Sequence, residues 1–252
     1  MKINDNFDAL KIYGGDSYRL NDRLSIRQPT LNEIKLYGEN RYFSMIHTLC
    51  AVGADLKWQL HDIGIDYTKI SDFELFYSIL SVKYTKDDTR ILFGDSLDFS
   101  QMKMTFHKEL QEDVMMQNFA DGSYIQIDKY LYASIVGVLR QMHRLKRNDE
   151  LPGNEMTRQI LIDDARNEYE ENKDKASGSC LLPLISTMVN SEGFKRDDTT
   201  VFQMKIRAFM DSVARISKIK NAELLLQSGY SGFGVNLAKI DKDVLNYMGE
   251  LD

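Results

Sequence analysis

Histidines and cysteines are the side chains in this sequence that could bind a transition metal or act in catalysis. No two histidines stand four residues apart, the spacing that places two ligands on one helix face, so no zinc site is indicated. We interpret the pair His61 and Asp62 as surface or helix-capping residues, because adjacent helical residues point to different faces. Neither cysteine has a neighbouring ligand, and we expect both to be small buried side chains. The residues concerned are His47, His61, His107, His143, Cys50 and Cys180.

Adjacent carboxylates are the second kind of residue that could do chemistry, because paired carboxylate oxygens bind Mg²⁺. We interpret these pairs as solvated helix faces or caps. A metal-dependent enzyme acting on nucleic acid or a host target is the alternative that they leave open. The pairs are Asp87–Asp88, Asp163–Asp164, Glu170–Glu171 and Asp197–Asp198.

A glycine-rich stretch near the end of the chain, SGYSGFG, is similar to two catalytic or cofactor motifs but matches neither. A nucleophile elbow needs glycine at the fifth place of G-x-S-x-G, where Phe233 stands. A dinucleotide loop needs G-x-G-x-x-G after a strand, and here the order is reversed and a helix precedes it. We interpret the stretch as a helix end followed by a hinge-like loop containing Gly229, Gly232 and Gly234.

Two groups of basic residues could touch phosphates, but no aromatic side chains alternate with them as in a nucleic-acid site. The first group ends a predicted helix, where cations suit the helix dipole, and the second forms the solvated face of another. The sequence therefore predicts a protein that is not an enzyme and has no catalytic residue, no metal and no cofactor. The groups are Arg140, Arg144, Lys146 and Arg147, and then Lys205, Arg207, Arg215, Lys218 and Lys220.

Composition limits the class of partner. The net charge of −6 and the pI near 5.4 argue against nucleic-acid binding through bulk charge. No apolar run is long enough to cross a membrane, and the N-terminus lacks the apolar core of a signal peptide, so we expect no membrane partner and a reducing cytoplasm. The twelve methionines are interpreted as adaptable core residues, with a pliable partner-binding surface as the alternative.

The first half of the chain must position these residues on helices and a small sheet. Extended pieces are expected in residues 8–27, and Pro29 then separates them from a helix at about 31–51, capped by Thr30 with Glu33. Further predicted helices follow Asp55, Ser71 and Asp128. Residues 89–127 are predicted to form a small antiparallel meander, with Asp121-Gly122 at a hairpin turn.

The second half is predicted to be helical. Residues 148–156 are the candidate boundary between an α+β lobe, 1–148, and a helical lobe, 149–252, although the two could form one compact domain. Helices are expected at about 155–172, at LLPLISTMV and after Asp241. The predicted fold class is therefore α+β, predominantly helical, with a small antiparallel meander and a short N-terminal β segment.

The most regular apolar spacing lies in a segment that Thr199 or Thr200 begins. Apolar residues recur there at alternating steps of four and three, which places them on one stripe of a helix. Such a stripe packs either inside the chain or against a partner, and we predict it as the partner-binding site. This seam consists of Phe202, Ile206, Phe209, Val213 and Ile216.

Two blocks resemble proteins encoded in the tail-morphogenesis gene clusters of bacteriophages of Gram-positive hosts. The first is IRQPTLNEIKLYGENRYFSMIHTLC, leading through DLKWQLHDIGIDYTKISDFELF, and the second, at the end, is LLLQSGYSGFGVNLAKIDKDVLNYMGEL; together they are roughly a third of the chain. The resemblance implies a tail assembly chaperone in the host cytoplasm that binds the tape-measure protein and recruits tail-tube subunits. A structural subunit of the tail or baseplate is the alternative. This chain is longer than many such chaperones and carries the additional meander.

Overall fold

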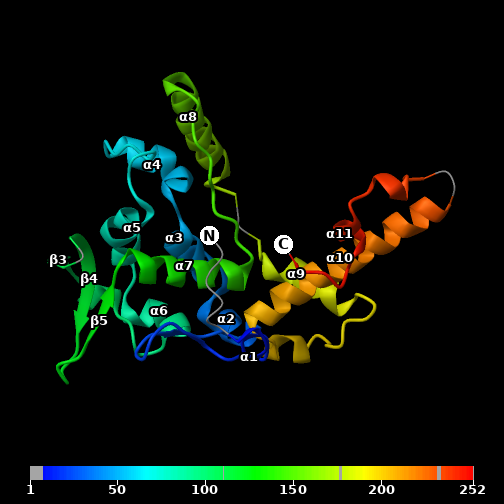
Figure 1. Cartoon of the computed structure of the whole chain (residues 1–252), viewed down its shortest axis with the longest axis horizontal. Coiled ribbons are helices and arrows are strands. Elements are labelled where there is room, and N and C mark those ends of the chain that lie inside the picture. The colour runs from blue at the N-terminus through cyan, green and yellow to red at the C-terminus, as the bar shows by residue number, and fades with distance from the viewer. Residues whose placement is uncertain (1–7, 110, 176–177, 232–233, 252) are drawn as a thin grey trace.

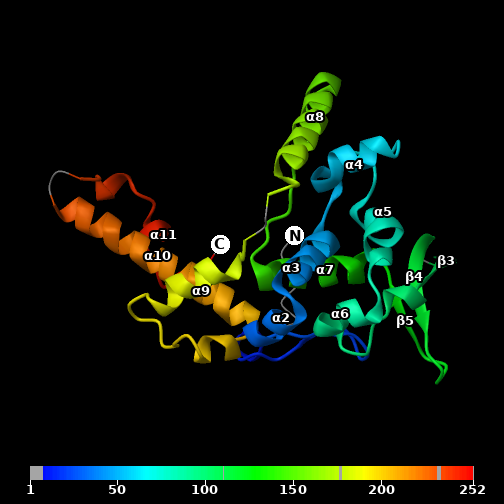
Figure 2. The same ribbon diagram turned by 180° about the vertical axis from the view of Figure 1, so that it is seen from behind.

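The computed structural model describes residues 8–109, 111–175, 178–231 and 234–251, and the chain is 56% helical. A body of helices and a small sheet carries two helical arms (Figure 1). One arm is α8 (Glu155–Asn172), and the other is the end of α10 (Ile206–Tyr230) with α11 (Lys242–Leu245). Both arms extend in the view from behind as well (Figure 2). The predicted class, α+β and mostly helical with small antiparallel strands, is confirmed.

The remaining helical elements follow one another with short connections. In the first half they are α1 (Ala9–Tyr13), α2 (Leu31–Tyr37), α3 (Glu39–Cys50), η1 (Gly53–Leu56), α4 (Lys57–Asp62), α5 (Asp72–Leu75), the π-helix η2 (Phe76–Leu80), η3 (Ser81–Lys83), α6 (Lys86–Phe93), η4 (Phe99–Gln101) and α7 (Lys129–His143). In the second half they are α9 (Leu181–Val189), η5 (Thr200–Gln203) and η6 (Leu237–Lys239).

The strands form two antiparallel units. A short hairpin joins β1 (Tyr18–Arg19) to β2 (Ser25–Ile26), and a meander of order β3-β4-β5 consists of β3 (Lys103–His107), β4 (Glu112–Asn118) and β5 (Tyr124–Ile127). The predicted turn at Asp121-Gly122 joins β4 to β5, and Gly122 there has a φ of +79°. The meander begins at Lys103 rather than near residue 89, because capping by Thr85 and Asp88 makes the preceding segment the helix α6.

The helix start at Thr30 forms as the sequence predicts. Thr30 Oγ1 accepts the Glu33 N–H at 3.1 Å, and the Glu33 carboxylate accepts the Thr30 N–H at 2.7 Å, which makes a capping box. The single predicted helix at 31–51 is instead two, α2 and α3. Gly38 separates them with a φ of +100°, a conformation that glycine adopts at low cost.

The chain at the start of α2 also hydrogen-bonds to the chain at the start of α10. The Leu31 N–H donates to the Met204 carbonyl at 3.0 Å, and the Ile206 N–H donates to the Pro29 carbonyl at 2.9 Å. The chain before α2 therefore holds the chain that begins α10.

Two further local predictions were wrong. The stretch ALKIY is not extended but forms α1, because Asp8 Oδ1 accepts the N–H groups of Leu10 and Lys11 and caps the helix. Asp55 does not cap α4. It lies in the preceding turn, η1, where its carboxylate accepts the Val52 N–H at 3.0 Å.

Most other predicted helix starts are confirmed. Asp128 caps α7, Ser71 caps α5 and Asp241 caps α11, each by accepting a main-chain N–H. The helix predicted at 155–172 coincides with α8, and LLPLISTMV is α9.

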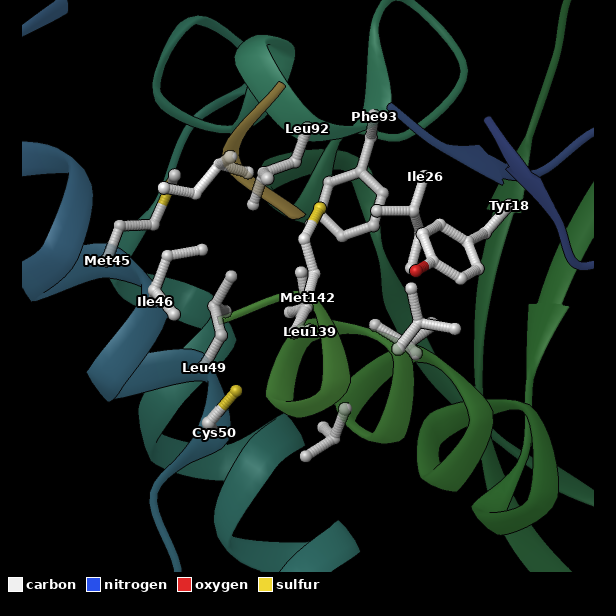
Figure 3. Packing of buried hydrophobic residues seen from close by; sticks show 14 of the residues in the cluster. Tyr18, Ile26, Met45, Ile46, Leu49, Cys50, Leu92, Phe93, Leu139 and Met142 are labelled. Carbon is white, nitrogen blue, oxygen red and sulfur yellow. The ribbon is translucent and has the colours of Figure 1, made fainter. Parts of the chain in front are cut away.

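Helix α7 lies at the centre of the main core (Figure 3), where Leu139 and Met142 face side chains of α3, α6 and the first hairpin. The sheet adds Met115 and Ile127 to the same cluster. The cluster continues beyond the predicted boundary near residue 148 into α9 and α10, for example to Phe209. The division into lobes 1–148 and 149–252 stays a prediction.

A second, smaller core lies beneath α8. Its buried residues include Leu60 of α4, Ile162 of α8 and Tyr67 of the chain after α4. They are separate from the main cluster. Helix α8 packs chiefly on α4, so this arm has its own small core.

Candidate partner-binding surfaces

The predicted seam runs from η5 into the first half of α10. Ile206 and Phe209 are fully buried in the main core, whereas Phe202, Val213 and Ile216 are half-buried and pack against its surface. Helix α10 contacts α7 along this stretch. Ile206 and Phe209 therefore serve internal packing. For the three half-buried residues, partner binding stays a prediction.

Phe202 borders a surface hollow of about 550 Å³. The Lys35 ammonium lies 4.5 Å from the centroid of the Phe202 ring, at cation–π distance. Thr30 and Asn32 also line the hollow, so it adjoins the corner at the start of α2.

A second hollow, of about 480 Å³, lies beside α10 and is called the cationic groove below. Its apolar side is formed by half-buried side chains of the main core and by exposed Tyr13, and three cations line it. Asp211 is the one carboxylate of the lining, and it faces the Arg207 guanidinium at 3.6 Å. The residues that define the groove are Tyr13, Phe194, Lys195, Arg196, Met204, Arg215 and Ile216.

Arg215 links the cationic groove to the end of the chain. Its Nη1 donates to the carbonyl of Gly249 at 2.8 Å and also to that of Tyr247. Lys218 Nζ donates to the carbonyl of Glu250 at 2.7 Å. Cations of α10 therefore hold the last described residues against this helix through main-chain oxygens.

Residues 224–251, named the C-terminal arm, expose large apolar side chains. Leu224 is 65% exposed, Tyr230 81% and Met248 80%. The turn after α10 packs closely, because a Cβ at Gly229 would lie 2.3 Å from the Cγ of Leu237. Of the predicted glycine loop, Gly229 lies inside α10, Gly234 follows it, and Gly232 is outside the described residues.

The carboxylate pairs hold local structure where the contacts are defined. Asp88 caps α6 and also pairs with the Arg41 guanidinium, and Asp197 accepts the N–H groups of Thr199 and Thr200. Lys173 pairs with Glu170. In the part of the chain that the structure describes, no three His, Cys, Asp or Glu side chains come together as metal ligands would.

His143 is buried beside Tyr42. Its Nδ1 lies 2.7 Å from the Leu139 carbonyl, which can only accept, so Nδ1 carries the proton and Nε2 accepts from the Tyr42 hydroxyl at 2.7 Å. Burial lowers the pKa of His143 to about 4. Sequence reasoning missed this pair, because the two residues lie on different helices. His47 and His61 are exposed, as the surface interpretation of His61 predicts.

The two cysteines differ. Cys50 is buried as predicted, but Cys180 is exposed, which corrects the prediction for that residue. Cys180 precedes α9, where the Glu39 carboxylate of α3 accepts its thiol at 3.0 Å and the Leu181 N–H at 2.6 Å. Burial and this carboxylate raise the pKa of the Cys180 thiol to about 11, so it is a poor nucleophile.

The basic group at the end of α7 is engaged in internal contacts. Arg140 donates to the Cys50 carbonyl at 2.6 Å, and Arg147 forms a two-pronged ion pair with Asp72. Arg147 and Asp72 also line a polar pocket of about 200 Å³ between α5 and the chain after α7. These cations therefore fix the connection from α7 toward α8.

Comparison of the chain with protein-family models, with curated proteins and with solved structures gives no match. Among the described helices, none has the length and apolar content that crossing a membrane requires. The resemblance to phage tail-morphogenesis proteins therefore stays a prediction from the sequence.

Proposed function

We propose that this chain is a non-enzymatic tail assembly chaperone of a bacteriophage, which binds the tape-measure or tail-tube protein in the host cytoplasm. The observation that carries the proposal is the C-terminal arm. It exposes the large apolar side chains of Leu224, Tyr230 and Met248 to solvent. A chaperone needs such adaptable apolar surface to hold an unassembled partner.

The placement of the resembling stretches adds to this proposal. The last stretch is residues 224–251, and none of its described residues is fully buried. Its exposed apolar side chains are therefore not required by a core, and binding to another protein gives them a role. The net charge of −6 would keep a protein with exposed apolar surface in solution.

Co-expression with each tail protein of the same phage tests the proposal. We expect a tagged copy of the chain to retain the tape-measure or tail-tube protein. The triple variant Leu224→Ser, Tyr230→Ser and Met248→Ser should lose that partner, while a control with Leu10→Ser, Leu36→Ser and Val82→Ser, also exposed apolar residues, should keep it. Retention of no tail protein by the wild-type chain would reject the proposal.

A structural subunit of the tail or baseplate is the second candidate, and the edge strand β3 favours it. Within the described residues, strand β3 pairs with β4 alone, and Met104 and Phe106 on it are exposed. An open edge can accept a strand from a neighbouring subunit. Mass spectrometry of purified virions separates the two candidates, because a subunit is present at a fixed copy number and a chaperone is absent.

A further inference from the structure

We propose that the cationic groove binds an acidic, apolar segment of the partner protein. This inference rests on the proposed function in one respect, that the chain acts by binding another protein. It adds the place on the chain where a partner segment docks and the chemistry of that segment.

The charge of the groove is the first reason. Its lining contains Lys195, Arg196 and Arg215, and its one carboxylate, Asp211, faces Arg207. Among the ion pairs of the described residues, none includes Lys195 or Arg196. A chain with a net charge of −6 thus presents a lining with three cations and one carboxylate here, and this excess of cations is complementary to carboxylates.

The neighbouring carboxylate Asp197 is engaged by the turn before η5. Asp197, which follows Arg196, is held by the main-chain N–H groups of Thr199 and Thr200 at 3.1 and 2.7 Å and by their hydroxyl groups. These hydrogen bonds lower the pKa of Asp197, and all of them are accepted by its Oδ1, within the turn before η5. The cations beside it remain exposed.

The apolar side of the groove is the second reason. Phe194, Met204 and Ile216 are half-buried side chains of the main core surface, so they provide a fixed apolar floor. Tyr13 of α1 is 52% exposed at its border. Apolar or aromatic partner side chains on this floor would exclude water from the carboxylate contacts at the rim and strengthen them.

The contacts of Arg215 are the third reason. This guanidinium already donates to two main-chain carbonyls in the turn after α11, so a cation at this border binds main-chain oxygens. The seam residue Ile216 lies in the same lining. A partner segment in the groove would therefore lie beside the C-terminal arm and contact the half-buried part of the seam.

Binding of a defined peptide to the full-length chain tests the inference. The probe is a fluorescein-labelled peptide of alternating Glu and Leu with one Phe, and its counterpart carries Lys in place of Glu. We expect saturable binding of the Glu peptide alone. The double variant Lys195→Glu and Arg196→Glu should weaken it by about tenfold or more, because two charge-assisted contacts are lost.

A matched control has the same net charge change on another surface. Lys103→Glu and Lys108→Glu replace two exposed cations of the meander and should leave the affinity within about twofold. Tyr13→Ser should weaken binding by about threefold without changing charge. Circular dichroism and thermal melts of each variant should match those of the wild-type chain, since all five substituted side chains are exposed.

Several outcomes would overturn the inference: no binding of the Glu peptide, equal weakening by the two double variants, or equal binding of the Lys peptide. Displacement of the Glu peptide by single-stranded DNA at equal phosphate and carboxylate concentration would also overturn it, in favour of a nucleic-acid site. In the co-expression experiment, the variant Lys195→Glu with Arg196→Glu could still retain the tail protein. That result would reject the groove as the docking site and leave the proposed function standing. If the wild-type chain retains no tail protein, the proposed function fails, and the peptide assay still decides the groove.

Discussion

Helices α7 and α10 contact each other in the core, yet they bury different shares of their length. Seven of the 15 residues of α7 are buried, against three of the 25 residues of α10. Those of α10 are Ile206 and Phe209 in its first turn and Ala222 in its second half, and the helix ends in the C-terminal arm. One helix therefore forms the fold, and the other anchors an arm whose apolar side chains the fold does not use.

Helix α8 buries an even smaller share of its residues than α10. It has 18 residues and buries one, Ile162, in the small second core. Its other contacts with the body include an ion pair between Arg166 and Asp62, one between Arg158 and Asp66, and the Trp58–Tyr169 ring contact at 5.1 Å. Partly exposed pairs of this kind contribute little stability each, so α8 depends on its one buried side chain.

The largest expected effect is a difference in stability between variants of the buried first turn of α10 and variants of its exposed end. Phe209→Ala should lower the free energy of unfolding by about 3–5 kcal/mol, because it leaves a cavity in the main core. Tyr230→Ala, on the same helix but 81% exposed, should change it by less than about 0.5 kcal/mol. Urea denaturation followed by circular dichroism measures both. Similar losses for the two variants would show that the arm is part of the cooperative core.

The second prediction concerns the independence of α8. Ile162→Ala should weaken the packing of α8 on α4 by about 2–5 kcal/mol, while the main core keeps its urea midpoint. Limited proteolysis should then cut within residues 155–172 at a higher rate. Ile160→Ala removes the same atoms from an exposed position of the helix and serves as the control. A fall in the midpoint of the whole chain would contradict the prediction.

The third prediction uses the buried pair on α7 and α3. The pKa of His143 is about 4 in the folded chain against 6.5 when unfolded, so the unfolded chain binds the extra proton between these values. Stability from neutral His143 is fully present above about pH 6.5 and is lost as the pH falls to about 4, by up to about 3 kcal/mol. Urea melts at pH 7 and pH 4.5 measure the loss.

A variant tests whether His143 causes that pH dependence. His143→Gln keeps an acceptor for the Tyr42 hydroxyl but cannot take up a proton, so its stability should vary less between pH 7 and pH 4.5. Asp66, Asp88 and Asp197 have pKa values below their usual range, so their contributions are lost only at lower pH. An unchanged pH dependence in the variant would rule out His143 as the cause.

Local sequence patterns predicted helix starts and turns, but they did not predict the contacts between residues far apart in the chain. The Thr30–Glu33 capping box and the Asp121-Gly122 turn depend on neighbours, and both form as predicted. The tie between Leu31 and Met204, or between Tyr42 and His143, joins residues far apart in the chain, and no spacing in the sequence signals it.

The candidate site was less predictable than the fold. Spacing identified the seam, and burial divides it, with Ile206 and Phe209 in the core and Phe202, Val213 and Ile216 half-buried at its surface. The cationic groove combines α1, the loop after α9 and α10, so its cations and apolar floor become neighbours only in the folded chain. Cys180 was misassigned for a related reason, because Glu39 of another helix caps α9 there and keeps the thiol at the surface.

The smallest expected effect is confined to the C-terminal arm. Gly229→Ala adds a methyl group where Leu237 now lies, so η6 must move away from α10. Alanine also favours the helix by about 1 kcal/mol over glycine, which offsets the lost contact in the overall free energy of unfolding. Hydrogen exchange in residues 235–246 should therefore become faster, while the urea midpoint stays the same.

A control for this substitution is Gly153→Ala, since no atom lies within 4 Å of its added methyl group. It should leave exchange in residues 235–246 unchanged. If Gly229→Ala also leaves exchange there unchanged, the segment after α10 does not depend on Leu237 for its position. If instead the midpoint of the whole chain falls as for Phe209→Ala, the arm and the root of α10 unfold together, and the contrast between the two halves of this helix disappears.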